Sequence, residues 1–220
     1  MRVAIAGAHG KIGQRLTRLL SVRGDQVVGL IRNPDHAGDV REVGAKPVVC
    51  DLEQAGLQEV AVAVEGCDAV VFAAGAGPGS GATRKQTMDR DGAVLLATAA
   101  EQAGVPRYLL ISAMGLERAD KLKPDDAFGV YLKAKLESEQ DLRERDLQWT
   151  ILRPGRLTDG AGTGLVKLGP PPLEPGSVSR QDVAEVLVEM LDQPATAGLT
   201  LELVAGHDDI PAAVAACIRR

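Results

Sequence analysis

The stretch VAIAGAHGKIG, residues 3–13, decides the fold. Small apolar residues at 3–6 predict a short buried strand, and Ile12 begins an apolar pattern with helical spacing. Gly7, Gly10 and Gly13 lie between them at intervals of three. Such glycines allow a tight turn, a close approach of the backbone to a diphosphate, and the packing of a helix on a strand. The stretch therefore predicts a dinucleotide-binding turn, and a glycine turn without a ligand is the alternative.

The same alternation of strand and helix continues along the chain. Because the strand-like runs are almost continuously apolar, they predict a parallel sheet that is buried on both faces. The fold class expected is therefore a doubly wound α/β (Rossmann) sheet with helices on both faces. The expected strands are residues 2–6, 26–31, 46–50, 68–74, 107–112, 149–153 and 199–204.

A chain of 220 residues has the length of one well-buried domain, so a single domain over 1–220 is expected. The pattern becomes irregular at about 156–179, where glycine and proline dominate. Within this segment only LVKL, residues 165–168, has the character of a short strand. We expect a loop or a small subregion on the substrate side there.

Charge and composition exclude several classes of protein. A net charge of −5 argues against binding of nucleic acid, which requires a basic surface. The longest apolar runs are about half of the ~20 residues that cross a bilayer, and the N-terminus lacks the pattern of a secretory signal. Cys50, Cys67 and Cys217 are far apart, without the spacing of metal ligands. We therefore expect a cytoplasmic protein with reduced cysteines and no metal.

The end of the second strand indicates which dinucleotide would bind. Sites for NAD usually carry an acidic residue there, about 20 residues beyond the glycines, to hold the ribose 2′-hydroxyl. Here the residue is Arg32, whose planar guanidinium can pair with a 2′-phosphate. The sequence thus favours NADP over NAD. In the alternative interpretation Arg32 is a solvated loop residue and Asp35 approaches the ribose.

Several motifs together resemble the short-chain dehydrogenase/reductase superfamily, and in particular its atypical branch, which includes proteins similar to nitrogen-metabolite-repression regulators and flavin reductases. The motifs are GAHGKIG, CDLEQ, VVFAAGAG, LLISAMG, YLKAK, ILRPGRLTD and VSRQDVAEVLVEML, and the resemblance covers nearly the whole chain. It implies that Asp51 and Leu52 flank an adenine and that the segment around Pro154 closes over a nicotinamide. The predicted cofactor-binding residues are Gly7, His9, Gly10, Lys11, Ile12, Gly13, Arg32, Asp51, Leu52, Ala73, Ala74, Gly75, Lys135, Pro154 and Gly155.

The predicted catalytic residues are Ser112, Tyr131 and Lys135. Tyr131 and Lys135 are four residues apart on an expected helix, so their side chains share a face. A nearby ammonium lowers the pKa of a phenol, which would let Tyr131 donate a proton to a carbonyl oxygen held by Ser112. The resemblance also implies a contact from Lys135 to the cofactor ribose. Alternatively, Tyr131 is only a packing residue.

Two positions depart from the pattern of the superfamily. Ala113 stands where relatives often have a second Ser or Thr, and Asp89 is the closest match to an Asn of extended members. The function expected is NADPH-dependent reduction of a small carbonyl, flavin or quinone-like acceptor by a monomer or small homo-oligomer. A non-catalytic NADP(H) sensor is the alternative. A sugar-nucleotide epimerase or dehydratase usually has a larger C-terminal domain than the roughly 65 residues after Arg156.

Overall fold

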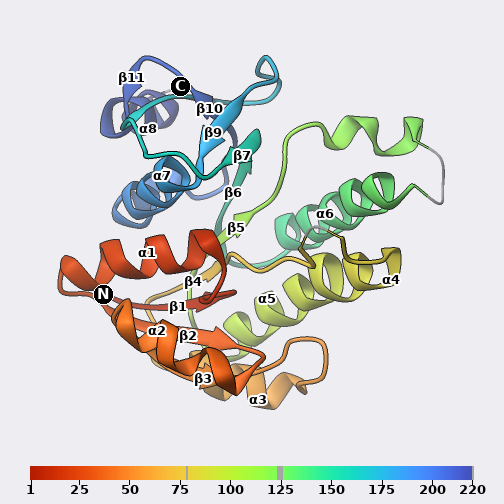
Figure 1. Cartoon of the computed structure of the whole chain (residues 1–220), viewed down its shortest axis with the longest axis vertical. Helices are drawn as coiled ribbons and strands as arrows, with labels where there is room; N and C mark the ends of the chain where they lie inside the picture. The colour runs from red at the N-terminus through yellow and green to blue at the C-terminus, as the bar shows by residue number, and fades with distance from the viewer. Residues whose placement is uncertain (78, 123–125, 220) are drawn as a thin grey trace.

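A nine-stranded sheet runs through the part of the chain that the computed structural model describes, residues 1–77, 79–122 and 126–219 (Figure 1). Its order is β11-β8-β10-β6-β5-β4-β1-β2-β3. Strands β1 to β6 and β10 are parallel, whereas β8 pairs antiparallel with β10 and β11. The doubly wound fold is confirmed, with an antiparallel edge added. The strands are β1 (Arg2–Ala6), β2 (Gln26–Ile31), β3 (Ala45–Val49), β4 (Ala69–Phe72), β5 (Arg107–Ile111), β6 (Gln148–Pro154), β8 (Leu165–Gly169), β10 (Thr200–Ala205) and β11 (Asp208–Asp209).

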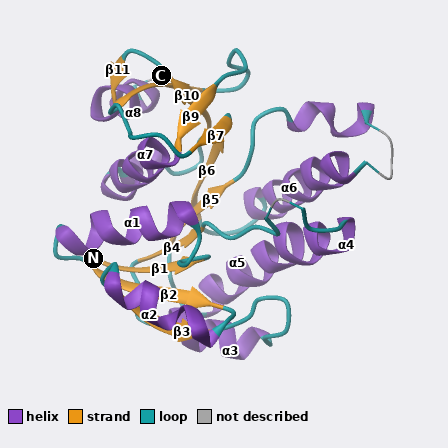
Figure 2. Cartoon of the chain, viewed as in Figure 1, coloured by secondary structure: helices purple, strands orange, loops and turns teal. Residues whose placement is uncertain are grey.

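Helices cover both faces of the sheet (Figure 2). Alternate residues of β1 enter two separate cores: Ile5 packs with α1 and α7, whereas Ala4 packs with α3 and α5. Near-continuous apolar strands are therefore buried on both sides. The helices are α1 (Lys11–Val22), α2 (Ala37–Glu42), α3 (Leu57–Val64), α4 (Ala82–Arg84), α5 (Ala93–Gln102), α6 (Ala127–Arg143), α7 (Arg180–Asp192) and α8 (Ile210–Ile218), with 3-10 turns η1 (Pro34–His36), η3 (Leu116–Lys121) and η4 (Pro194–Thr196) and a π-helical segment η2 (Lys85–Gly92).

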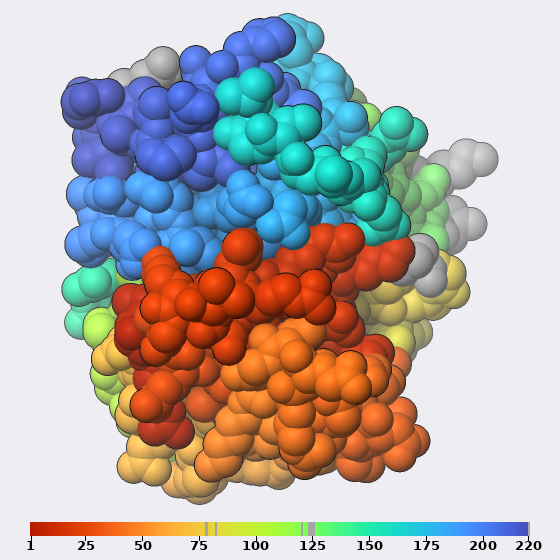
Figure 3. Space-filling model, turned by 60° about the vertical axis from the view of Figure 1, so that its left-hand side comes forward, coloured from red at the N-terminus to blue at the C-terminus, as the bar shows by residue number. Residues whose placement is uncertain are grey.

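A helix from the first part of the chain packs against one from the last part. Helix α7 lies along α1, and in the space-filling view the blue surface of this part of the chain borders the red surface of the N-terminal part (Figure 3). Leu16 of α1 and Leu187 of α7 are both fully buried in the same core. The C-terminal part therefore completes one face of the sheet.

The segment at about 156–179 is more regular than expected. The strand expected at LVKL is β8, but β7 (Arg156–Thr158) and β9 (Ser177–Ser179) form an additional parallel pair. Each has only three residues, too few to show a period-2 pattern. The buried carboxylate of Asp182 orders the segment, because it accepts hydrogen bonds from the amides of Thr163 and Gly164 at 2.9 Å.

Among the described residues, no helix combines the length and apolarity needed to cross a bilayer. The same part of the chain contains no group of three or more potential metal ligands. Cys50, Cys67 and Cys217 are all buried.

Candidate functional site

The glycine turn between β1 and α1 is shaped by close backbone contacts. Gly7 has φ +81°, and a Cβ there would lie 2.7 Å from backbone atoms of Ala74. The amide of Gly10 donates to the Gly7 carbonyl at 2.8 Å, and a Cβ on Gly13 would overlap that same oxygen. Helix α1 starts at Lys11 without a side-chain cap. Its first amides are therefore available to an anion at the helix N-terminus.

A cavity of about 340 Å³ opens over this turn. It lies at the carboxyl ends of β1, β2 and β4, where the strand order reverses and where ligands of such folds bind. The predicted cofactor-binding residues that line it are Gly7, His9, Gly10, Arg32, Leu52, Ala73, Ala74 and Gly75. The lining residues that sequence reasoning missed are Ala6, Leu30, Ile31, His36, Cys50, Ala76, Gly77, Arg84 and Met88.

The charge-bearing side chains of this lining are all basic. They are Arg32, Arg84, His9 and His36, and none of the lining residues given above is acidic. This is notable in a chain with a net charge of −5. The cavity is therefore suited to an anionic ligand.

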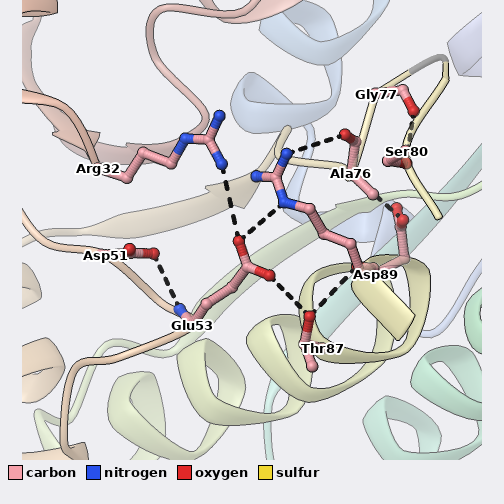
Figure 4. A network of polar contacts seen from close by, with 9 residues as sticks. Arg32, Asp51, Glu53, Ala76, Gly77, Ser80, Thr87 and Asp89 are labelled. Carbon is pink, nitrogen blue, oxygen red and sulfur yellow. Dashed lines mark hydrogen bonds and ion pairs between the residues drawn. The ribbon is translucent and has the colours of Figure 1, made fainter. Parts of the chain in front are cut away.

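Arg32 and Arg84 share one counterion, Glu53, which does not itself line the cavity (Figure 4). Glu53 Oε2 lies 3.1 Å from Arg84 Nε and 3.8 Å from Arg32 Nη1, and Glu53 Oε1 accepts a hydrogen bond from Thr87 at 2.7 Å. Asp51 supports this arrangement, because its carboxylate accepts from the Glu53 amide at 3.1 Å. Glu53 thus connects β2, the β3–α3 loop and α4.

A second polar cluster lies beyond the cavity, at the carboxyl end of β5. The Lys135 ammonium donates to the Ile111 carbonyl at 3.0 Å and lies 3.2 Å from Asp89 Oδ1, and both side chains are almost completely buried. Asp89 Oδ2 accepts from the Ala76 amide at 3.2 Å. The buried Ser112 Oγ has no hydrogen-bond partner among the described residues, whereas Asp89 Oδ1 has its ion pair with Lys135. One buried hydroxyl is therefore left for another group to satisfy.

Tyr131 does not have the lowered pKa that its spacing from Lys135 predicts. Burial raises the pKa of Tyr131 above its ordinary value, Lys135 opposes this, and Asp89 adds to the rise. The ring of Tyr131 stacks near Phe128, and Lys85 Nζ lies 5.1 Å from its centre. The spacing correctly gives the direction of the Lys135 effect but omits burial and a carboxylate from η2.

The remaining predicted residues do not line the cavity. Lys11 points outward and pairs with Asp159 at 2.6 Å, whereas Ile12 is buried in the core. Pro154 accepts from the Met114 amide at 3.1 Å, and the Gly155 amide donates to Leu203. Ser112, Tyr131 and Lys135 also lie outside the lining. Asp35, the alternative to Arg32, is exposed and is absent from the lining.

These residues fit a nicotinamide dinucleotide. The glycine cradle, which a Cβ on Gly7 would fill, suits a diphosphate. The unpartnered Ser112 Oγ lies at the end of β5, the strand beyond β4. A dinucleotide that extends from β1 toward β5 runs in the direction of this hydroxyl.

Comparison with known proteins agrees with this geometry. Residues 7–194 match the sequence profile of a family described as NAD(P)H-binding. A Bacillus subtilis relative, named an uncharacterized sugar epimerase, YhfK, is 35% identical over 97% of this chain and 99% of its own.

Two solved structures share the fold over nearly their full lengths. A Bacillus halodurans protein, described as a NAD-dependent epimerase/dehydratase, superposes with a TM-score of 0.90 at 35% identity and covers 98% of this chain and 99% of its own. ChuY, an anaerobilin reductase of Escherichia coli O157:H7, superposes with a TM-score of 0.79 at 27% identity over 93% of this chain and 97% of its own. The chain belongs to the NAD(P)H-binding family and has a Rossmann fold.

Proposed function

We propose that this protein is an NADPH-dependent oxidoreductase that reduces a small carbonyl, flavin or quinone-like acceptor. The observation that carries the proposal is a cavity beside a glycine cradle whose lining contains two Arg and two His side chains and no acidic one, with the unpartnered Ser112 hydroxyl nearby at the end of β5. The reductase ChuY, which shares the fold at 27% identity, supports the same class of reaction.

The preference for NADPH rests on Arg32. The side chain is about half exposed, lines the cavity at the end of β2 and is only loosely paired with Glu53, at 3.8 Å. A guanidinium in this position can turn toward a 2′-phosphate and bind it with two hydrogen bonds. No acidic side chain among the described lining residues competes for a ribose 2′-hydroxyl.

The residues near β5 would position the acceptor and supply the proton. A bound NADPH supplies hydride, two electrons with one hydrogen, to the acceptor carbon or ring. Ser112 Oγ donates a hydrogen bond to the acceptor oxygen, and Tyr131 Oη delivers the proton that completes the reduction and is reprotonated from solvent. Because the pKa of Tyr131 is raised, the phenol keeps its proton at neutral pH and acts as the acid in this direction.

A second candidate function is a non-catalytic NADP(H) sensor. It is favoured by the engagement of Lys135, whose ammonium is held by Asp89 and the Ile111 carbonyl and lowers the pKa of Tyr131 by less than burial raises it. The epimerase names of two relatives favour sugar nucleotides as a third possibility. In this chain, however, β10 of the C-terminal region extends the sheet, and α7 and α8 cover it.

The experiment is a comparison of NADPH and NADH binding by calorimetry, followed by a screen of aldehydes, ketones, quinones and free flavins with NADPH. We expect the wild-type protein to bind NADPH more tightly than NADH, and we expect the Arg32→Ala variant to lose this preference. With the best acceptor, Tyr131→Phe should lower turnover by roughly 10²–10⁴-fold while cofactor affinity is retained. Tight NADPH binding with no reactive acceptor would favour the sensor, and equal affinities for the two cofactors would contradict the NADPH assignment.

A further inference from the structure

Two of the three histidines of the chain face each other in the cavity. His9 comes from the glycine turn and His36 from η1, directly after β2, and their rings stack with centres 3.6 Å apart and planes 11° apart. Both rings line the same cavity as Arg32. The pair therefore lies between the turn expected to hold a diphosphate and the side chain expected to hold a 2′-phosphate.

The ring of His9 has a fixed hydrogen-bonding role. Its Nε2 lies 2.9 Å from Asp39 Oδ2 on α2. Because a carboxylate only accepts, Nε2 carries a proton, and in the neutral ring Nδ1 is then an acceptor. A phosphate oxygen cannot bond to an acceptor. Addition of a proton makes Nδ1 a donor and the ring a cation, which a phosphate can use.

The charged surroundings of the pair are few. Asp39 on α2 holds His9, and Arg32, the residue after β2, contributes a charge on this side of the cavity, which Arg84 also lines. Asp35, the acid of η1, is exposed. A phosphate monoester loses its second proton near pH 6 and is a dianion above that pH, so it is attracted to a ring that has gained a proton.

We propose that His9 and His36 form a proton-dependent subsite, beside Arg32, for the 2′-phosphate of NADPH. This inference rests on the proposed use of NADPH and identifies two further residues that determine cofactor specificity. Binding of the 2′-phosphate takes up a proton on the pair, so the preference for phosphorylated over unphosphorylated cofactor increases as the pH falls from about 8.5 to about 6.5.

The test uses 2′,5′-ADP and 5′-AMP, which differ only in the 2′-phosphate and need no nicotinamide. Calorimetry at several pH values from about 6.5 to 8.5 gives the ratio of their dissociation constants. We expect the preference for 2′,5′-ADP to rise about tenfold toward the lower pH, the effect of one charge-assisted hydrogen bond. In His9→Gln and His36→Gln this dependence should flatten. His207→Gln changes the third histidine, which is exposed beside β11 and is absent from the cavity lining, and should leave the ratio unchanged.

A measurement without variants tests the same point. Imidazole signals in NMR spectra of the wild-type protein come from three histidines, and we expect two of them to shift with 2′,5′-ADP and to move toward the protonated form. A preference for 2′,5′-ADP that does not change with pH would overturn the inference but leave the NADPH assignment intact. Equal losses of 5′-AMP and 2′,5′-ADP affinity in the variants would assign the pair to the 5′-phosphate and also overturn it. Failure of both ligands to bind would overturn the proposed function itself.

Discussion

Replacement of Asp89 by Asn should lower the pKa of Tyr131. In the wild type the Asp89 carboxylate lies 3.2 Å from the Lys135 ammonium and offsets its charge. The substitution keeps the size of the side chain and an oxygen that can accept from the Ala76 amide, but it removes the negative charge. The positive field of Lys135, one helical turn from Tyr131, would then act unopposed and favour the phenolate.

The size of the effect follows from Coulomb's law. At an effective dielectric constant of about 20, two unit charges about 10 Å apart interact by about 1.7 kcal/mol, and about 1.4 kcal/mol corresponds to one pKa unit. Removal of the carboxylate beside the Lys135 ammonium should therefore lower the pKa of Tyr131 enough for a titration to resolve. Burial still raises the pKa of Tyr131 in the variant, so the fall partly cancels the rise seen in the wild type.

The chain is well suited to this measurement because it contains two tyrosines. Carbon-13 NMR of the ring Cζ reports the charge on each phenol. Tyr108 is buried, which raises its pKa strongly, so its signal serves as a reference that does not titrate. The other signal is assigned with Tyr131→Phe.

Asp91→Asn provides the matched control. Asp91 lies on the same π-helical segment, but its side chain is half exposed and pairs with Arg90 at 2.6 Å. Solvent screens its charge, so the pKa of Tyr131 should stay unchanged. A Tyr131 titration that is the same in wild type and Asp89→Asn, or that shifts equally in both variants, would refute the idea that Asp89 offsets Lys135.

Three further predictions concern stability and the cavity. Glu139→Gln removes the charge of a fully buried carboxylate that lies 2.6 Å from the Arg153 guanidinium, and it should cost about 3–5 kcal/mol in urea denaturation. Glu137→Gln changes a partly exposed ion pair with Arg90 on the same helix and should cost no more than about 1 kcal/mol. Gly7→Ala combines a φ of +81° with a backbone overlap, so the folded variant should lose 5′-ADP binding in calorimetry; unchanged affinity would contradict the cradle. Burial raises the pKa of the Cys50 thiol to about 11, so its alkylation, followed by mass spectrometry, should keep accelerating up to that pH and should slow when 5′-ADP fills the cavity; a plateau near pH 8 would contradict this.

The parts of the fold that depend on local patterns could be predicted from the sequence. The glycine turn, the alternation of strand and helix, and the position of Arg32 at the end of β2 all follow from spacing within a few residues. Strands β7 and β9 could not be predicted, because three-residue strands have no readable period. His36 lies on the short turn after β2, where no periodic pattern marks it as part of the cavity.

The part of the site that the sequence did not reveal depends on contacts between distant elements. Glu53 and Arg84 meet although 31 residues separate them, and no periodicity records such a pairing. The same reason explains why the sequence predicts a lowered pKa for Tyr131, whereas in the structure that pKa is raised. The spacing of Tyr131 and Lys135 is visible on one helix, whereas Asp89 reaches Lys135 from η2, whose π-helical geometry departs from the regular helical period.

Asp89 also connects the two halves of the site. One carboxylate oxygen accepts from the amide of Ala76, in the cavity wall, and the other lies beside the Lys135 ammonium. The ammonium offsets the charge of the carboxylate, so neither group is buried without a partner. Gly75 keeps the space beside this pair open, since a Cβ there would lie 3.1 Å from Asp89 Oδ1. Asp89 thus contacts both the wall of the cavity and the ammonium beside Tyr131, and replacing it by Asn changes the charge next to Tyr131 while the side chain keeps its size.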